Sequence, residues 1–163
     1  MFQRSNLLCH VSVADILSTF QRNVRIDESG RARLTEYGLA PITRNPTLTV
    51  SAIPAALEGP LAPELIGASS TPLVESKPAD IFAFSMLALE LLTSTPPFNG
   101  QPPAMAALLI SQGVRPEFPQ NAEDLGLTTR MRNFLHRCWD PDPMQRPTID
   151  EVVDTLESKD INE

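Results

Sequence analysis

The sequence predicts a mainly α domain that carries one small β-hairpin and one long irregular loop. Polar and apolar residues alternate on both sides of the turn-forming residues 27–30, which is the pattern of a hairpin. Residues 39–61 hold four prolines and show no periodicity, whereas helical signals dominate the chain from residue 76 onward. The length of 163 residues and a hydrophobic content of 42% suit one domain with one core.

Each predicted element has a local cause. The alternation through 24–27 and 31–34 predicts two short strands joined at Asp27-Glu28-Ser29-Gly30. The segment LAPELI (61–66) predicts a helical turn that begins after a proline. Loops as long as 39–61 are uncommon inside compact domains and are usually functional or mobile.

Four helices are expected in the second half of the chain. The helix over 79–93 is apolar on all its faces, so we expect it to be buried on all sides, with Ser76 as N-cap and Pro78 in its first turn. A helix over 102–112 begins at proline, and the helix over 128–138 has apolar residues at helical spacing. A capping-box pair, Thr148 and Glu151, predicts the start of a final helix.

Charge and composition exclude several classes of protein. The net charge of −7, without a Lys/Arg cluster, argues against nucleic acid as a partner. The longest apolar run, 81–92, is too short to span a bilayer, and the N-terminus lacks the pattern of a signal peptide. Cys9 and Cys138 show neither paired nor zinc-type spacing. We therefore expect no membrane contact and a reducing location, in the cytoplasm or nucleus.

Several motifs occur in a recognisable order after Asn23. They are the hairpin sequence NVRIDESGRARLTEYGLA, Ala62-Pro63-Glu64, the helix start at Asp80, PPF (96–98) and CWDPDPMQRPT (138–148). In this order they resemble the C-terminal lobe of a eukaryotic-type protein kinase, nearest the tyrosine-kinase-like serine/threonine group. The resemblance implies a mainly α, kinase-like C-lobe over 23–157 with an activation-loop-like segment. Residues 1–22 remain an unassigned N-terminal segment, and 158–163 form a tail.

The resemblance gives four residues structural roles. Glu64 would pair with Arg146, with both charges largely buried, and removing one partner of such a pair costs roughly 3–5 kcal/mol. Asp80 would lie at the N-terminal end of the central helix and accept backbone N–H bonds from the catalytic loop. Trp139 would anchor the late helices.

The catalytic positions of the family are altered in this chain. Ser18 stands where the family has the proton-accepting Asp, and Phe20 stands at the following Lys position. Serine cannot act as a carboxylate base near neutral pH, and Asp15 is three residues out of register. Leu57 and Pro60 replace the Thr and Tyr that usually precede Ala-Pro-Glu.

The nucleotide-binding features are also reduced. The sequence contains no Gly-x-Gly-x-x-Gly, and the 22 residues before Asn23 are too few for an N-terminal lobe. Asn23 and Glu36 match the two metal-ligand positions, with twelve residues between them, but Glu36 replaces Asp and Mg²⁺ demands near-ideal geometry. They would form a weak, residual Mg²⁺ and cofactor site. Asn23 fits a turn or strand-edge asparagine equally well. Tyr37 and Gly38 retain the aromatic residue and the glycine that follow the metal-binding Asp of the family.

Three functions follow from this resemblance. The leading hypothesis is a catalytically inactive kinase-like domain, without cofactor, that binds a protein partner through the surface around 102–119. The second is a serine/threonine protein kinase, using ATP and Mg²⁺, whose N-terminal lobe is missing from this chain. The third is a decaying duplicate without function, which would expose apolar surface and be poorly soluble. The sequence identifies neither the partner nor the oligomeric state.

Overall fold

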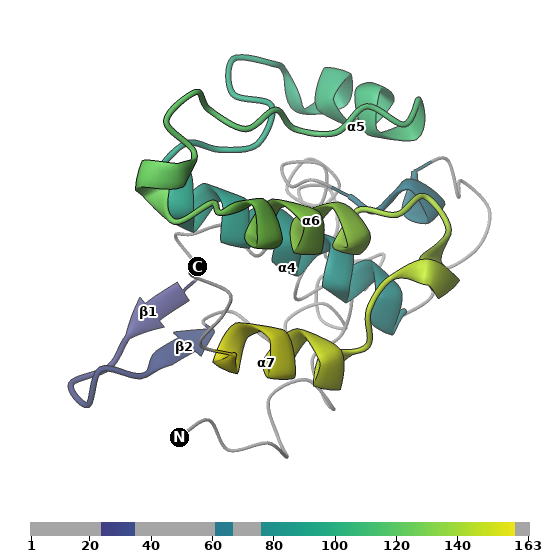
Figure 1. The fold of residues 1–163 in the computed structure, drawn as a ribbon. Helices are drawn as coiled ribbons and strands as arrows, with labels where there is room; N and C mark the ends of the chain where they lie inside the picture. The colour runs from purple at the N-terminus through teal and green to yellow at the C-terminus, as the bar shows by residue number, and fades with distance from the viewer. Residues whose placement is uncertain (1–23, 35–60, 67–75, 159–163) are drawn as a thin grey trace, which may run out of the picture.

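The computed structural model describes residues 24–34, 61–66 and 76–158, and Figure 1 shows their arrangement. The elements are, in chain order, β1 (Val24–Ile26), β2 (Ala32–Leu34), the 3₁₀ turn η2 (Pro63–Leu65), α4 (Lys77–Thr93), α5 (Pro103–Ser111), η3 (Glu123–Leu125), α6 (Thr129–Cys138), η4 (Pro143–Gln145) and α7 (Ile149–Glu157). The predicted mainly α fold with one small hairpin is confirmed. The predicted helices at 102–112 and 128–138 are confirmed to within one residue at each end.

The hairpin forms around the carboxylate of Asp27. Strands β1 and β2 pair antiparallel, with Arg25 opposite Arg33. Asp27 Oδ1 accepts hydrogen bonds from the backbone N–H groups of Ser29 and Arg31, each at 3.0 Å, and Asp27 Oδ2 accepts one from Arg33 Nε at 2.9 Å. The Ser29 hydroxyl also donates to Asp27 Oδ1, at 2.6 Å. These bonds favour the ionised form and hold the pKa of Asp27 well below its ordinary value, with the bond from the Ser29 hydroxyl contributing most. Gly30, at φ 77°, supplies the left-handed residue of the turn.

The start of α4 is capped differently from the expectation. Ser76 occupies the N-cap position, as predicted, but its side chain makes no capping hydrogen bond. An N-cap hydroxyl accepts from the backbone N–H of the second or third helical residue. Here the second residue is Pro78, which has no N–H, and the N–H of Ala79 donates to the backbone oxygen of Ser76 at 3.0 Å. Proline therefore defines this helix start without a side-chain cap.

Helix α4 is the central helix, but it is not enclosed on every side. Phe82 and Met86 are at most 1% exposed, and the buried Ser85 satisfies its hydroxyl by donating to the Phe82 carbonyl at 2.6 Å. Leu91 in the last turn is 47% exposed. The prediction of a helix buried on all sides is thus wrong at its C-terminal end, where the chain leaves the core for the loop that leads to α5.

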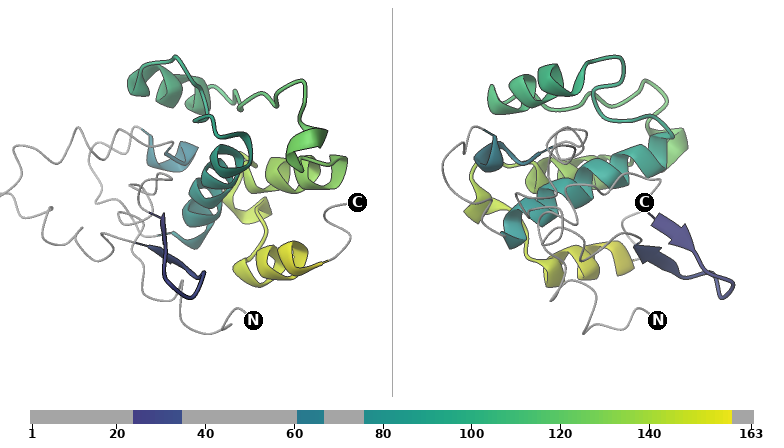
Figure 2. Two further views of the ribbon diagram at one scale, coloured as in Figure 1. Left: turned by 90° about the vertical axis from the view of Figure 1, so that its left-hand side faces the viewer. Right: turned by 180° about the vertical axis from the view of Figure 1, so that it is seen from behind.

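The helices form layers around α4. Helix α4 packs against α6, and η4 lies against α4. Helix α5 lies on one side of this pair and α7 on the other, an order that the three views of Figures 1 and 2 share. The largest fully buried side chains come from these helices and their loops: Phe82, Met86, Ile110, Leu127, Leu135, Cys138, Trp139 and Val152.

The last two helices have conventional N-terminal caps. Thr128 caps α6 by accepting a hydrogen bond from the Met131 N–H at 3.2 Å. The predicted capping box of α7 is confirmed: the Thr148 side chain accepts from the Glu151 N–H, and Glu151 Oε2 accepts from the Thr148 N–H at 2.7 Å. None of the helices in the described ranges has the length and apolarity needed to cross a bilayer.

Candidate functional site

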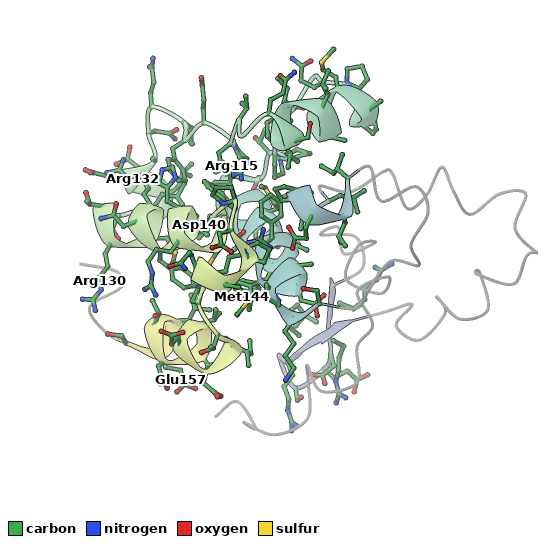
Figure 3. The ribbon with its side chains drawn as sticks, turned by 90° about the vertical axis from the view of Figure 1, so that its right-hand side faces the viewer. Arg115, Arg130, Arg132, Asp140, Met144 and Glu157 are labelled. Carbon is green, nitrogen blue, oxygen red and sulfur yellow. The ribbon has the colours of Figure 1, made fainter. Side chains whose placement is uncertain are left out.

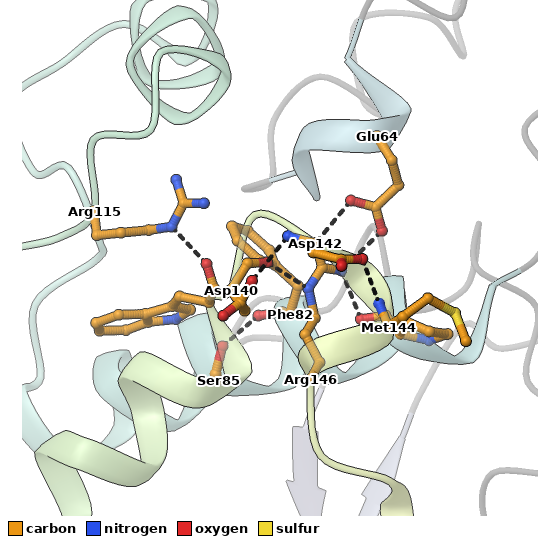
Figure 4. A network of polar contacts seen from close by, with 10 residues as sticks. Glu64, Phe82, Ser85, Arg115, Asp140, Asp142, Met144 and Arg146 are labelled. Atoms are coloured by element: carbon orange, nitrogen blue, oxygen red, sulfur yellow. Dashed lines mark hydrogen bonds and ion pairs between the residues drawn. The ribbon is translucent and has the colours of Figure 1, made fainter.

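A network of polar contacts centres on Arg146, at the end of η4, and joins segments that are far apart in the sequence (Figure 4). Its Nη1 and Nη2 donate to the two carboxylate oxygens of Glu64, each at 2.8 Å. Nη1 also donates to the Pro78 carbonyl, and Nε donates to the Asp140 carbonyl, both at 2.9 Å. The network therefore fixes η2, the start of α4 and η4 to one another.

The two charges of this ion pair differ in their exposure. The Arg146 side chain is 0% exposed, whereas 25% of the Glu64 side chain remains accessible. The expectation that both charges are largely buried holds fully for Arg146, while Glu64 keeps partial contact with solvent because it lies on the single turn η2. A bidentate ion pair between a carboxylate and a buried guanidinium is strong, because no water molecule can replace the carboxylate as the partner of the guanidinium.

Arg115 is a second cation near Arg146, and no motif in the sequence pointed to it. Its Nε donates to the Trp139 carbonyl at 2.8 Å, and its Nη1 donates to the carbonyls of Ile110 and Val114 at 3.1 and 3.0 Å. Partial burial, followed by the charge of Arg146, lowers the pKa of Arg115. The one available signal was its position directly after 24 uncharged residues, 91–114.

The side chain of Phe82 lies within reach of both cations. The Arg146 guanidinium carbon is 5.2 Å from the ring centroid, and that of Arg115 is 5.5 Å from it. Cation–π contacts of this kind contribute about 0.5–2 kcal/mol each, more when the cation is desolvated. The ring thus allows two like charges to lie near each other in a largely apolar environment.

Trp139 lies in the aromatic part of the core. It is 1% exposed, stacks on Phe118 with ring centroids 5.6 Å apart, and meets the ring of His136 edge-on at 5.4 Å. Its indole N–H has no hydrogen-bond acceptor among the described residues. The neighbouring Cys138 is buried, and burial raises the pKa of its thiol to about 12, so this thiol is inert at neutral pH.

Asp80 lies in the first turn of α4, at the position that the sequence analysis expected. Its expected donors, the backbone N–H groups of the catalytic loop, belong to residues outside the described ranges. The described ranges also leave out Ser18, Asn23, Glu36 and the loop over 39–60. The structure therefore brings Glu64 and Arg146 together and places Trp139 in the core, and it describes no geometry for the catalytic or metal positions.

Further predictions concern residues outside the described part of the chain. They are the positions of Asp15, Phe20, Tyr37, Gly38, Leu57 and Pro60 and the unassigned segment 1–22. Among the described residues, no group of three or more His, Cys, Asp or Glu side chains could hold a metal ion. Asn23 and Glu36, through which the resemblance would have Mg²⁺ and ATP held, lie outside the described residues.

Comparison with known proteins agrees with the order of motifs. The model of the protein kinase domain family matches residues 21–156, and the chain belongs to this family. A probable serine/threonine-protein kinase of Dictyostelium discoideum is 27% identical over 135 residues, covering 82% of this chain and 9% of the relative. Serine/threonine-protein kinase VIK of Arabidopsis thaliana is 37% identical over 81 residues, covering 50% of this chain and 18% of VIK.

A third relative covers the same share of this chain as the first. Serine/threonine-protein kinase STY17 of Arabidopsis thaliana is 28% identical over 142 residues, covering 82% of this chain and 22% of STY17. The chain therefore spans less than a quarter of the length of these relatives. It is a protein kinase domain chain related to serine/threonine kinases.

Proposed function

We propose that this chain is a catalytically inactive kinase-like domain that acts as a protein-binding module. One combination carries the proposal: the ion pair of Glu64 and Arg146 is formed, while Ser18 stands at the position of the family's catalytic carboxylate. An ion pair of this kind stabilises the fold without taking part in proton transfer. A serine at the proton-accepting position leaves phosphoryl transfer without its base.

The neighbouring positions support the same proposal. Phe20 cannot supply the positive charge that the family's Lys provides, and Leu57 cannot donate the hydrogen bond of the family's Thr. Asn23 and Glu36 keep an amide and a carboxylate as metal ligands, but Glu is one methylene longer than Asp. Mg²⁺ accepts little change in ligand geometry, so we expect binding of ATP and Mg²⁺ to be weak or absent.

A thermal-shift titration tests the proposal. A ligand that binds only the folded state raises the melting temperature, by an amount that grows with ligand concentration over Kd. We expect no rise with millimolar ATP, either alone or with Mg²⁺ or Mn²⁺. A rise that requires the metal ion and disappears in Glu36→Gln would contradict the proposal and support a functional metal site.

An activity assay completes the test. The purified chain is expected not to phosphorylate a generic acceptor protein. Phosphorylation that survives Ser18→Ala but is lost in Asp15→Ala would show that Asp15 has taken over as the base, and the inactive assignment would then be wrong.

The second candidate function is a serine/threonine protein kinase that uses ATP and Mg²⁺. The retained pair Asn23 and Glu36 and the relationship to serine/threonine-protein kinases favour it. An in-frame Gly-rich loop and a Val-Ala-x-Lys strand in the genomic sequence upstream of this chain would support this candidate. The same two experiments distinguish it from the binding module.

A further inference from the structure

Helix α5 (Pro103–Ser111) is apolar around its whole circumference, yet only one of its nine residues, Ile110, is buried. A helix that is hydrophobic on all faces is normally enclosed by protein. Met105 and Leu108 are 43% and 48% exposed on the outward face of α5, and Val114, just beyond the helix, is 42% exposed. The fold covers one side of this helix and leaves the other side in water.

The sequence segment that contains α5 is also free of charge. Residues 91–114 contain no Asp, Glu, Lys or Arg, in a chain whose net charge is −7. Sixteen of these 24 residues are exposed. All views place α5 at the outer edge of the domain, on the side of α4 and α6 that is remote from α7 (Figures 1 and 2).

The orientation of α5 is fixed by Arg115. By bonding the Ile110 and Val114 carbonyls together with the Trp139 carbonyl, this side chain ties the C-terminal end of α5 to the end of α6. The apolar face is therefore presented by an anchored helix. Preorganisation of this kind reduces the ordering cost of association.

We propose that two copies of this chain associate through the outward face of α5, about a two-fold axis. Each copy is acidic overall, so the repulsion between two copies is smallest when they meet through an uncharged surface. A two-fold contact places the same patch on both sides, and a neutral apolar patch is compatible with itself. A charged partner would gain no complementary charge from residues 91–114.

The size of the patch sets the expected strength. Standard interfaces use about 20–30 residues on each side, and the large apolar residues exposed at α5, Met105, Leu108 and Val114, are far fewer. The dimer should therefore be weak and reversible, with a Kd in the micromolar range. This inference rests on the part of the proposed function that assigns binding to the surface around 102–119.

Sedimentation velocity over about 1–300 μM protein, a range that brackets this Kd, tests the inference. We expect the wild-type chain to pass from monomer to dimer, and Met105→Glu and Leu108→Glu to remain monomeric because each places like charges across the two-fold axis. Met144→Glu is the matched control: Met144 is 82% exposed on η4, apart from α5, and this variant should dimerise as the wild type does (Figure 3). Far-UV circular dichroism melts verify that the variants fold.

Ionic strength provides a second readout. Salt screens the repulsion between the acidic bodies of the two copies, so the wild-type dimer should tighten when salt is raised. A wild-type chain that stays monomeric throughout the range, or a Met105→Glu variant with an unchanged Kd, would overturn the inference. The proposed function fails separately, through nucleotide binding or phosphorylation, which sedimentation does not measure.

Discussion

Neutralising Glu64 should destabilise the fold far more than neutralising an exposed carboxylate. The guanidinium of Arg146 is fully buried and donates hydrogen bonds to both carboxylate oxygens of Glu64, each at 2.8 Å. Glu64→Gln keeps the size of the side chain but removes its charge, and it replaces one acceptor oxygen with an NH₂ group that faces another donor. The buried cation is then left with one neutral amide oxygen and two backbone carbonyls, those of Pro78 and Asp140, and with no negative charge.

The magnitude follows from the exposure of the pair. Breaking a buried ion pair costs roughly 3–5 kcal/mol, and breaking an exposed one costs roughly 0–1 kcal/mol. Because 25% of the Glu64 side chain is accessible, we expect Glu64→Gln to lower the free energy of unfolding by about 2–3 kcal/mol. Arg146→Met should cost about 3–4 kcal/mol, since it also removes the hydrogen bonds that Arg146 donates to the Pro78 and Asp140 carbonyls. The double variant should cost little more than Arg146→Met alone, which corresponds to a coupling energy of about 2 kcal/mol.

Urea unfolding followed by tryptophan fluorescence measures each variant, because Trp139 is the only tryptophan and is buried in the folded state. The matched control is the cycle of Glu123→Gln and Arg132→Met, an ion pair at 3.1 Å whose Glu123 side chain is 74% exposed. Its coupling should stay below about 1 kcal/mol. Equal couplings in the two cycles would refute the argument that burial of the Arg146 guanidinium makes the first pair strong.

Two further predictions use other parts of the fold. Arg115→Met should lower the free energy of unfolding by about 1–3 kcal/mol because it removes three hydrogen bonds to backbone carbonyls, of which, within the described ranges, only the Ile110 carbonyl keeps a second donor, the Gly113 N–H. Arg31→Met on the exposed hairpin should change the free energy of unfolding by less than about 0.5 kcal/mol, and the same urea assay compares the two variants. Glu151 accepts hydrogen bonds from the Thr148 backbone and side chain, which lower its pKa, so the stability it adds is complete above the ordinary carboxylate pKa and is lost as pH falls through the lowered pKa. The stability difference between wild type and Glu151→Gln should therefore be largest near neutral pH and shrink in acid; a difference that grows in acid would contradict this assignment.

The elements that could be predicted from the sequence are those with local causes. The capping box of α7 depends on Thr148 and Glu151, three positions apart, and the hairpin depends on alternation around Asp27. Such patterns are complete within a few residues, so no knowledge of the tertiary fold is needed to read them. The pairing of Glu64 with Arg146 was expected only through the family resemblance, because no local pattern links positions so far apart.

The features that escaped prediction depend on tertiary packing. Arg115 bonds backbone carbonyls, which every residue carries, so its partners leave no mark on the sequence. The exposure of Leu91 depends on where the chain leaves the core, and an apolar stretch does not indicate that point. The unused hydroxyl of Ser76 follows from the competing backbone oxygen of the same residue, which the predicted cap did not take into account.

The ion pair of Glu64 and Arg146 also bears on how the chain is made. Its members are 82 positions apart, and synthesis proceeds at about 5–20 residues per second, so Glu64 precedes its partner by roughly 4–16 s. During that interval η2 and the beginning of α4 have been translated, but the cation that joins them has not. We expect a ribosome stalled before residue 146 to hold a nascent chain in which this region is readily cleaved by protease, and release of the remaining residues to protect it.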